Sequence, residues 1–446
     1  PSQDLWPVDV RRFARFNGNR RWLRQRVKEA LGLHYAMAWP NRELTTARPL
    51  RRSPLFDRLA AKRAVFGSRM GWERANWFAA DGSPREIAYS FGRQNWFCSV
   101  AEEHRACREA VAVFDMTSFA KLLLQGRDAE RVLQRLCAND VAVPVGRSVY
   151  TPMLNQRGGF ESDVTIARLA EDMFLLLTGT AQGVRDTHWI RGHIPDDARA
   201  VLTDVTSAYA VIGVMGPRSR ALLAQVGDEP LDAQAFPFGA VREIGIGNAT
   251  VWAARRSYMG ELGWELYVPS EFAVTTYDTL AAVGADFGLR DAGYYAIESL
   301  RLEKAYRAWG RELTPDVTPW ETGLSFAVKP GKSADFIGRA ALQEAAARPL
   351  RRRLVALLAD DPDTPQIWGG ERVIGGDDAD GEITSAAYGH SLGGVVALGW
   401  VQSRDAAIDE AWLAERRFVV DVAGELVPVR SSLQPFYDPA GARLDG

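Results

Sequence analysis

The chain has 446 residues, of which 47% are hydrophobic and 25% charged, and its formal net charge is −2. This composition is typical of a globular protein with about two to four domains and excludes a disordered or low-complexity chain. No apolar run reaches the ~20 residues of a membrane span, and no secretory signal is visible at the start, so we expect no membrane contact and a cytoplasmic location.

Cysteine and histidine usage excludes two kinds of site. The three cysteines, Cys98, Cys107 and Cys137, form no paired framework, which indicates a reducing compartment. The five histidines are scattered, and none stands at metal-ligand spacing beside a cysteine or glutamate. The sequence therefore predicts neither a disulfide framework nor a metal site.

The amino-terminal segment is basic and rich in tryptophan. Residues 1–85 contain 18 Lys and Arg but only 7 Asp and Glu, a net charge of +11. This charge favours an anionic neighbour, such as a cofactor phosphate, a glutamate tail, an acidic partner chain or nucleic acid, although a solvated, salt-bridged surface explains it equally well. Leu23, Val27 and Leu31 recur every fourth residue, which predicts a helix from Arg20 to Leu31. The density of tryptophans indicates packing and not a disordered tail.

A hairpin is predicted over residues 150–169. Gly158 and Gly159 can adopt the positive φ of a tight turn, and a proline at position 152 places the first strand at an edge or makes it start late. In the second strand Phe160, Ser162, Val164 and Ile166 share one face, and Asp163 lies on the other. From periodicity alone, Asp163 is a solvated acid on a half-exposed strand.

A second turn and strand occupy residues 257–268. Gly260 and Gly263 bracket the turn, and Glu261 at its tip is expected to be solvated. Along the following strand, Trp264, Leu266 and Val268 face one way, whereas Glu265 and Tyr267 face the other. Glu265 is therefore a second carboxylate held on a regular strand.

The remaining elements complete an α+β pattern. We expect helices over residues 102–112 and 296–305, and in the latter Glu298 and Arg301 lie one turn apart, as in a local ion pair. Residues 345–353 form a linker. Short strands with Gly and Asp turns over residues 354–446 predict a small β-barrel or a sandwich.

Gly389-His-Ser-Leu-Gly393 matches the Gly-x-Ser-x-Gly pattern of serine hydrolases. That pattern needs a buried strand before it and a histidine after it. Ser385–Tyr388 is a poor buried strand, and His390 is the last histidine of the chain. We therefore reject a hydrolase.

Several motifs together resemble one protein family. Three motifs are similar to motifs of the folate-binding aminomethyltransferase of glycine cleavage. They are Met-Leu-Asn-x-x-Gly-Gly-x-x-x-Asp, which ends at Asp163, Phe-Asp-Met-Thr at 114–117 and Tyr-x-Gly-Glu-x-Gly-x-Glu at 258–265. The same fold forms the carboxyl-terminal half of dimethylglycine and sarcosine dehydrogenases. Ser162 replaces the first of two adjacent acids in the glycine-cleavage branch, so the chain is more similar to the dimethylglycine branch.

The resemblance implies a fold and three site residues. The fold is an aminomethyltransferase-type folate-binding α+β fold of three subdomains around a central channel, including a C-terminal β-barrel, with an N-terminal connector alongside. We expect a connector at 1–85, similar to the central domain of flavin oxidoreductases, a folate-binding core at 86–345 and the barrel at 354–446. Asp163 is implied as the catalytic carboxylate, and Glu265 and Tyr258 as pterin-binding residues. Arg301 could alternatively meet an anionic folate tail.

The resemblance also implies a reaction and a partner. Tetrahydrofolate would capture the iminium or formaldehyde from oxidative N-demethylation of dimethylglycine or sarcosine, giving 5,10-methylenetetrahydrofolate. No Gly-x-Gly-x-x-Gly turn near the amino terminus supplies an FAD site, so we expect most of any FAD site on a flavoprotein partner chain or a removed segment. The alternatives are a folate-dependent O- or S-demethylase that makes 5-methyltetrahydrofolate and a non-catalytic folate-binding subunit. We expect a small-molecule one-carbon donor and no nucleic acid.

Overall fold

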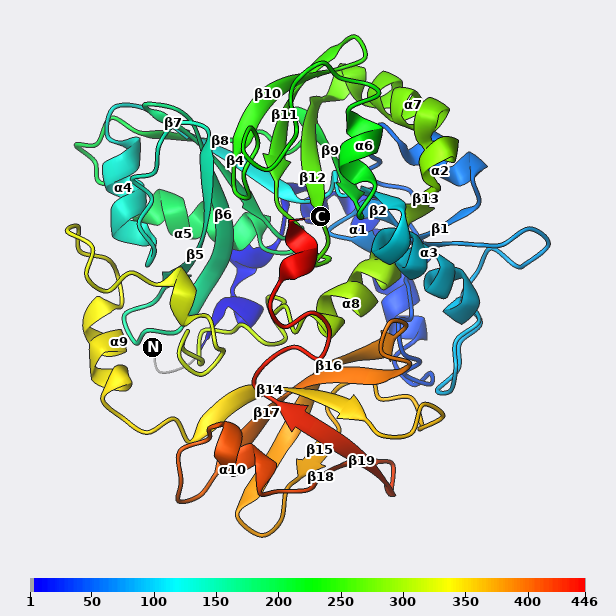
Figure 1. Ribbon diagram of the computed structural model, residues 1–446, viewed down its shortest axis with the longest axis vertical. Helices are drawn as coiled ribbons and strands as arrows, with labels where there is room; N and C mark the ends of the chain where they lie inside the picture. Colours follow the sequence, from blue (N-terminus) through cyan, green and yellow to red (C-terminus); the bar gives the residue numbers. More distant parts are fainter. Residues whose placement is uncertain (1–3, 446) are drawn as a thin grey trace.

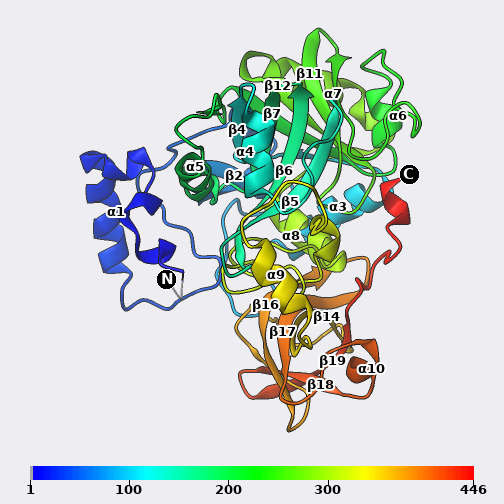
Figure 2. The same cartoon turned by 90° about the vertical axis from the view of Figure 1, so that its left-hand side faces the viewer.

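The computed structural model describes residues 4–445, which form two β-sheets with their helices, a closed barrel and an amino-terminal connector (Figure 1). The two sheets lie side by side in the upper part of Figure 1, and the barrel lies below them. Figure 2 shows that α1 of the connector stands at one side, outside the body that the other elements form.

The connector begins with a helical segment and ends with a small hairpin. Its elements are η1 (Trp6–Val8), η2 (Val10–Arg12), η3 (Arg15–Gly18), α1 (Arg20–Gly32), α2 (Phe56–Ala61), β1 (Ala64–Arg69) and β2 (Trp72–Phe78). Helix α1 matches its predicted span and contains no buried residue. The tryptophans of the β1–β2 hairpin, in contrast, are buried, so the hairpin and not α1 joins the connector to the core.

The larger sheet has six strands and two packed faces. Its order is β10 (Val241–Ile246), β11 (Ala249–Arg255), β12 (Gly263–Pro269), β9 (Tyr209–Met215), β3 (Val111–Asp115) and β13 (Leu289–Ala292), with only β13 and β3 parallel. Its helices are α3 (Phe97–Glu109), α6 (Ser219–Leu223), α7 (Ala273–Gly284) and α8 (Tyr294–Glu303). The alternation predicted for β12 is confirmed, because Trp264 and Leu266 enter one core cluster and Tyr267 the other.

The second sheet contains the predicted hairpin. Its order is β5 (Arg147–Leu154), β6 (Phe160–Ala170), β7 (Met173–Thr178), β4 (Ala120–Gln125) and β8 (Val201–Asp204), with α4 (Ala129–Leu136) and α5 (Gly183–Gly192). Pro152 lies on the edge strand β5, as predicted. Gly158 takes the positive φ of the turn, whereas a side chain at Gly159 would collide with the Pro315 carbonyl oxygen, 1.9 Å from an added Cβ.

The carboxyl-terminal strands close into a barrel. Of the two folds predicted for this segment, the barrel is therefore correct and the sandwich is not. Its order is β14 (Arg352–Ala359), β17 (Gly394–Ser403), β16 (Ala379–Gly389), β15 (Arg372–Ile374), β18 (Phe418–Val422) and β19 (Glu425–Ser432), with α10 (Glu410–Ala414). The predicted linker is shorter than expected, because α9 (Arg339–Ala346) extends into it and β14 begins before it ends.

One expectation about local structure is wrong in its bounds. The helix predicted over 102–112 is α3, which starts at Phe97 and stops at Glu109, because the residues from Val111 onward form strand β3 of the large sheet. Ser385–Tyr388 belongs to β16, but only the first of its four residues is buried, as expected of a poor buried strand. Among residues 4–445, no helix has both the length and the apolar character needed to cross a bilayer.

Candidate functional site: a cavity between the subdomains

One cavity of about 810 Å³ is lined by the connector, both sheets, the barrel and the loop after α8. Asp163 of β6, Tyr258 of the turn before β12 and Glu265 of β12 all line it. The two carboxylates therefore come from different sheets and face one space. This volume lies within the ~300–1,000 Å³ typical of small-molecule pockets.

Asp163 is held by two neutral donors. Tyr150 donates its hydroxyl to Oδ2 at 3.1 Å, and the Gln182 amide donates to Oδ1 at 3.2 Å. Burial raises the pKa of Asp163, and the two hydrogen bonds only partly oppose it. No cation pairs with this carboxylate among the described residues. Asp163 is therefore oriented by its neighbours and is a stronger base than an exposed aspartate.

Glu265 is bound through one oxygen. Its Oε2 accepts the Tyr267 hydroxyl and lies 2.9 Å from Arg256 Nε, and Arg256 also donates to the Tyr267 hydroxyl at 2.7 Å. No described residue contacts Oε1 within hydrogen-bond distance. The side chain thus has one occupied oxygen and one free oxygen in the cavity wall.

Tyr258 belongs to an aromatic wall. Its hydroxyl donates to the Arg307 carbonyl oxygen at 2.8 Å, and its ring stacks on that of Tyr306 with centroids 6.0 Å apart and planes 25° apart. Burial raises the pKa of Tyr258, so the hydroxyl stays neutral. Sequence periodicity did not identify Tyr150, Gln182 or Arg256. Of the residues that contact the three predicted site residues, only Tyr267 was indicated by the sequence pattern, since it lies on the same strand face as Glu265.

Glu298 and Arg301 form the predicted ion pair, 2.6 Å apart. Arg301 is fully buried and also pairs with Glu312, at 3.1 Å. It does not line the cavity. The alternative role for Arg301, at an anionic folate tail, therefore has no support in its position.

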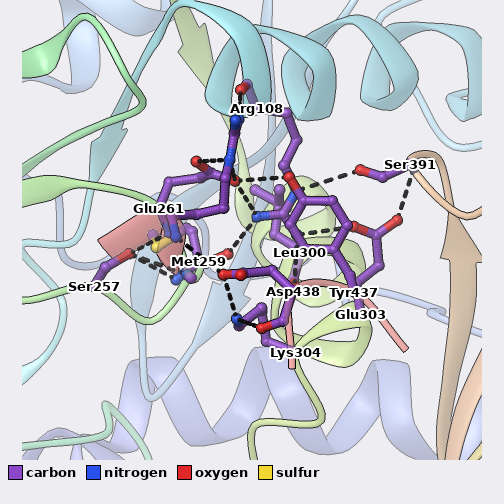
Figure 3. Close-up of polar contacts among 12 residues, drawn as sticks. Arg108, Ser257, Met259, Glu261, Leu300, Glu303, Lys304, Ser391, Tyr437 and Asp438 are labelled. Carbon is purple, nitrogen blue, oxygen red and sulfur yellow. Dashed lines mark hydrogen bonds and ion pairs between the residues drawn. The ribbon is translucent and has the colours of Figure 1, made fainter. Parts of the chain in front are cut away.

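The prediction that Glu261 is solvated is wrong, as Figure 3 shows. The side chain is 1% exposed and accepts hydrogen bonds from Arg108, at 3.0 Å, and from Arg443 and Tyr437 of the C-terminal segment. The turn is covered because the chain returns after the barrel, where Leu262 donates its N–H to the Arg443 carbonyl oxygen. A sequence pattern cannot show that a distant segment will cover a turn.

Ser391 lies on the β16–β17 hairpin, not on a strand-to-helix elbow. Its hydroxyl is 2.9 Å from His104 Nε2, and Nδ1 of His104 is bound to Ser299. The nearest acid, Glu303, approaches Nε2 as well, at 3.3 Å. A triad acid must orient the other ring nitrogen, so this geometry supports the rejection of a hydrolase.

Family comparisons cover most of the chain. Residues 55–332 match the "GCVT N-terminal domain", residues 352–438 the "Glycine cleavage T-protein C-terminal barrel domain" and residues 1–53 the "FAD dependent oxidoreductase central domain". The aminomethyltransferase T of the Bartonella henselae glycine cleavage system has the same fold, with a TM-score of 0.72 at 24% identity over 87% of this chain and 99% of that one.

Three curated relatives are similar in sequence. The formaldehyde-forming 4-methylaminobutanoate oxidase of Paenarthrobacter nicotinovorans is 41% identical over 100% of this chain and 53% of its own. Human mitochondrial sarcosine dehydrogenase is 33% identical over 100% and 53%, and the aminomethyltransferase of Shouchella clausii (strain KSM-K16) is 33% identical over 86% and 96%. The chain spans about half the length of the first two relatives. The chain belongs to the glycine cleavage T-protein family of folate-binding aminomethyltransferases, and the fold predicted from its motifs is confirmed.

Proposed function

We propose that this chain transfers a one-carbon unit to tetrahydrofolate. The donor is the iminium, or the formaldehyde it releases, from oxidative N-demethylation of an amine such as dimethylglycine or sarcosine. With formaldehyde, condensation at N5 and N10 of the folate forms 5,10-methylenetetrahydrofolate and releases water. The observation that carries the proposal is the shared cavity, in which two carboxylates from separate sheets stand beside an aromatic wall.

Glu265 is the pterin-binding group in this proposal. A pterin presents an exocyclic amine and a ring N–H side by side, and a carboxylate accepts from such donors. Because Oε2 already binds Tyr267 and Arg256, Oε1 supplies the free acceptor. The two partners also fix the carboxylate before the ligand arrives. The stacked rings of Tyr258 and Tyr306 provide a flat surface for the bicyclic ring.

Asp163 is the catalytic residue in this proposal. As a carboxylate it accepts the proton that an attacking folate nitrogen loses, and its negative charge stabilises a cationic electrophile beside it. The raised pKa strengthens it as a base, while Tyr150 and Gln182 keep its oxygens in place. Neutral donors suit this role, since a paired cation would lower the basicity of the carboxylate.

Two features of the connector support a flavoprotein partner. Leu23 is 45% exposed, Val27 44% and Leu31 70%, and they lie on one side of α1. The other side is tied to the chain by Glu29, which accepts hydrogen bonds from Thr45 and Thr46. An apolar stripe that nothing in residues 4–445 covers is typical of an interface. The match of this segment to a central domain of FAD oxidoreductases makes an FAD-binding domain its proposed occupant.

The test replaces Asp163 with alanine. Tetrahydrofolate and dilute formaldehyde are mixed anaerobically, and formation of 5,10-methylenetetrahydrofolate is followed above the uncatalysed background. Loss of a positioned general base lowers the rate by about 10²–10⁴-fold. The control is Asp172→Ala, an exposed acid in the turn after β6. Equal rates in Asp163→Ala and wild type would remove Asp163 from the mechanism. Mass spectrometry of the product separates 5,10-methylene- from 5-methyltetrahydrofolate, the product of the demethylase alternative.

A further inference from the structure

Two arginines of the connector hairpin line the cavity. Arg69 ends β1 and Arg74 lies in β2, and both face the same space as Asp163 and Glu265. They belong to the basic amino-terminal block, whose charge the folate chemistry at Asp163 and Glu265 does not use. Part of that block therefore lies on the cavity wall, where Arg69 is exposed and Arg74 half-buried.

Other basic residues of the connector are neutralised by acids. Arg48 pairs with Glu73 at 2.6 Å, and Lys62 pairs with Asp291 at 2.7 Å. The side chains of Arg69 and Arg74, in contrast, make no hydrogen bond or ion pair with any residue in 4–445. Burial lowers the pKa of Arg69, and the charges of Arg74 and Arg311 lower it further, because the one acid nearby, Glu43, does not offset them. The cavity thus has an excess of positive charge at its connector end.

Arg74 is connected to the proposed catalytic residue through a short chain of contacts. Its guanidinium lies 3.7 Å from the centre of the Tyr294 ring, and the Tyr294 hydroxyl is 3.1 Å from Ser118 Oγ. Ser118 in turn contacts Thr180, in the same turn as the Gln182 that holds Asp163. The two arginines and Asp163 are therefore linked along one wall of a single cavity.

We propose that Arg69 and Arg74 form a carboxylate-binding subsite, which holds the acidic end of a ligand whose amine end lies beside Asp163. The inference rests on the proposed function. A guanidinium is always charged and binds a carboxylate through two parallel N–H donors, and one stacked on an aromatic ring is already oriented. The carboxylate has two chemical sources: the glutamate tail of the folate, or the acid group of an amino-acid-derived donor.

The first arm of the test measures binding of three folates by anaerobic calorimetry. The ligands are tetrahydropteroate, which lacks glutamate, tetrahydrofolate, and its pentaglutamate. The proteins are wild type, Arg69→Gln, Arg74→Gln and the double variant, with Arg24→Gln, an exposed arginine of α1 outside the cavity, as the control. If the glutamate tail is the source, each cavity variant weakens binding of the two glutamate-bearing ligands about tenfold and leaves tetrahydropteroate binding unchanged.

The second arm uses dimethylglycine and 4-methylaminobutanoate, titrated into protein saturated with tetrahydropteroate. If the donor's acid group is the source, these amino acids bind wild type and lose about tenfold in the cavity variants, while all three folates keep their affinity. The subsite is refuted if the double variant matches wild type in both arms, or if tetrahydropteroate weakens as much as tetrahydrofolate. One-carbon transfer to tetrahydropteroate, run on the same variants, tests the proposed function separately, because that reaction needs no carboxylate.

Discussion

The cluster around Arg108 and the wall of the cavity are both rich in charge, but they differ in how that charge is satisfied. Arg108 uses all of its guanidinium nitrogens: Nη1 donates to Met259 O and Glu261, Nη2 to Leu300 O and Glu303, and Nε to Ser391 (Figure 3). In the cavity, Asp163 has no cation, Glu265 has a free oxygen, and Arg69 and Arg74 form no ion pair with a described residue.

The difference separates structural charge from charge that is available to a ligand. The Arg108 cluster joins α3, α8, the barrel hairpin and the C-terminal segment, so its ion pairs fix the subdomains around the cavity. Buried charges that are fully paired cannot bind a ligand without breaking those contacts. Unpaired charges on a cavity wall are costly unless a ligand pairs with them. Substitutions at paired and at unpaired charges should therefore have different effects on stability and on ligand binding.

The largest effect is expected for Glu303→Gln. It removes the charge that pairs with Arg108 at 2.8 Å and lies 3.3 Å from His104, and breaking a buried pair costs about 3–5 kcal/mol. Although burial opposes it, the contacts with His104 and Arg108 lower the pKa of Glu303 to about 2. This stabilisation is present above pH 4.5 and is lost as the pH falls toward 2.

Urea unfolding at pH 7 and at lower pH measures the free energy of unfolding. The control is Glu382→Gln, an exposed glutamate of β16, which should change stability by less than about 0.5 kcal/mol. Folate affinity of the folded Glu303→Gln protein should equal that of wild type. A loss of affinity with unchanged stability would mean that the cluster serves the ligand and not the fold.

Asp163→Asn should have the opposite effect on stability. Burial raises the pKa of Asp163, so the folded state binds a proton more tightly than the unfolded chain does, and the carboxylate destabilises the fold at neutral pH. The asparagine variant should be at least as stable as wild type at pH 7, by up to about 1 kcal/mol. Its advantage should disappear as the pH falls through the raised pKa toward that of an exposed aspartate.

The same titration should appear in activity. One-carbon transfer by wild type should decline on the acid side at a pH above the ordinary aspartate pKa, since only the carboxylate accepts a proton. Asp163→Asn should be inactive across this range. If the variant is destabilised by several kcal/mol instead, Asp163 belongs with Glu303 as a structural charge.

Local pattern was enough to predict part of this structure. The alternation of β6 correctly separated Asp163 from the core-facing residues, because that strand is buried on one side at every second position. The alternation of β12 correctly placed Glu265 opposite Trp264 and Leu266, although both faces of β12 are buried. The apolar spacing of α1 gave its bounds. That Asp163 and Glu265 share a cavity came from resemblance to a family and not from pattern, since strands of different sheets meet only through tertiary packing.

The errors have the same cause. Glu261 was expected in solvent, and the exposure of the apolar stripe of α1 was not predicted. The first is covered by residues about 180 positions later, at Arg443, and the second stays exposed in residues 4–445. Neither the carboxylate environment of Glu261 nor the unpaired state of Arg69 and Arg74 leaves a trace in nearby sequence. Whether a charged side chain is paired depends on which acids or cations tertiary packing brings beside it from distant parts of the chain.

The smallest effect is expected for Ser391→Ala, which tests whether an exposed member of the Arg108 cluster has any role beyond packing. Its hydroxyl contacts His104 at 2.9 Å and Arg108 at 3.3 Å, but Arg108 keeps four other acceptors without it. Water can replace an exposed hydroxyl, so unfolding should become easier by only about 0.5 kcal/mol. One-carbon transfer should be unchanged, and a fluorophosphonate probe should not label wild type at this residue. Labelling at Ser391 would show that its hydroxyl is activated, even though Glu303 and Ser391 approach the same nitrogen of His104. The Arg108 cluster would then be a reactive site and not a structural contact between subdomains.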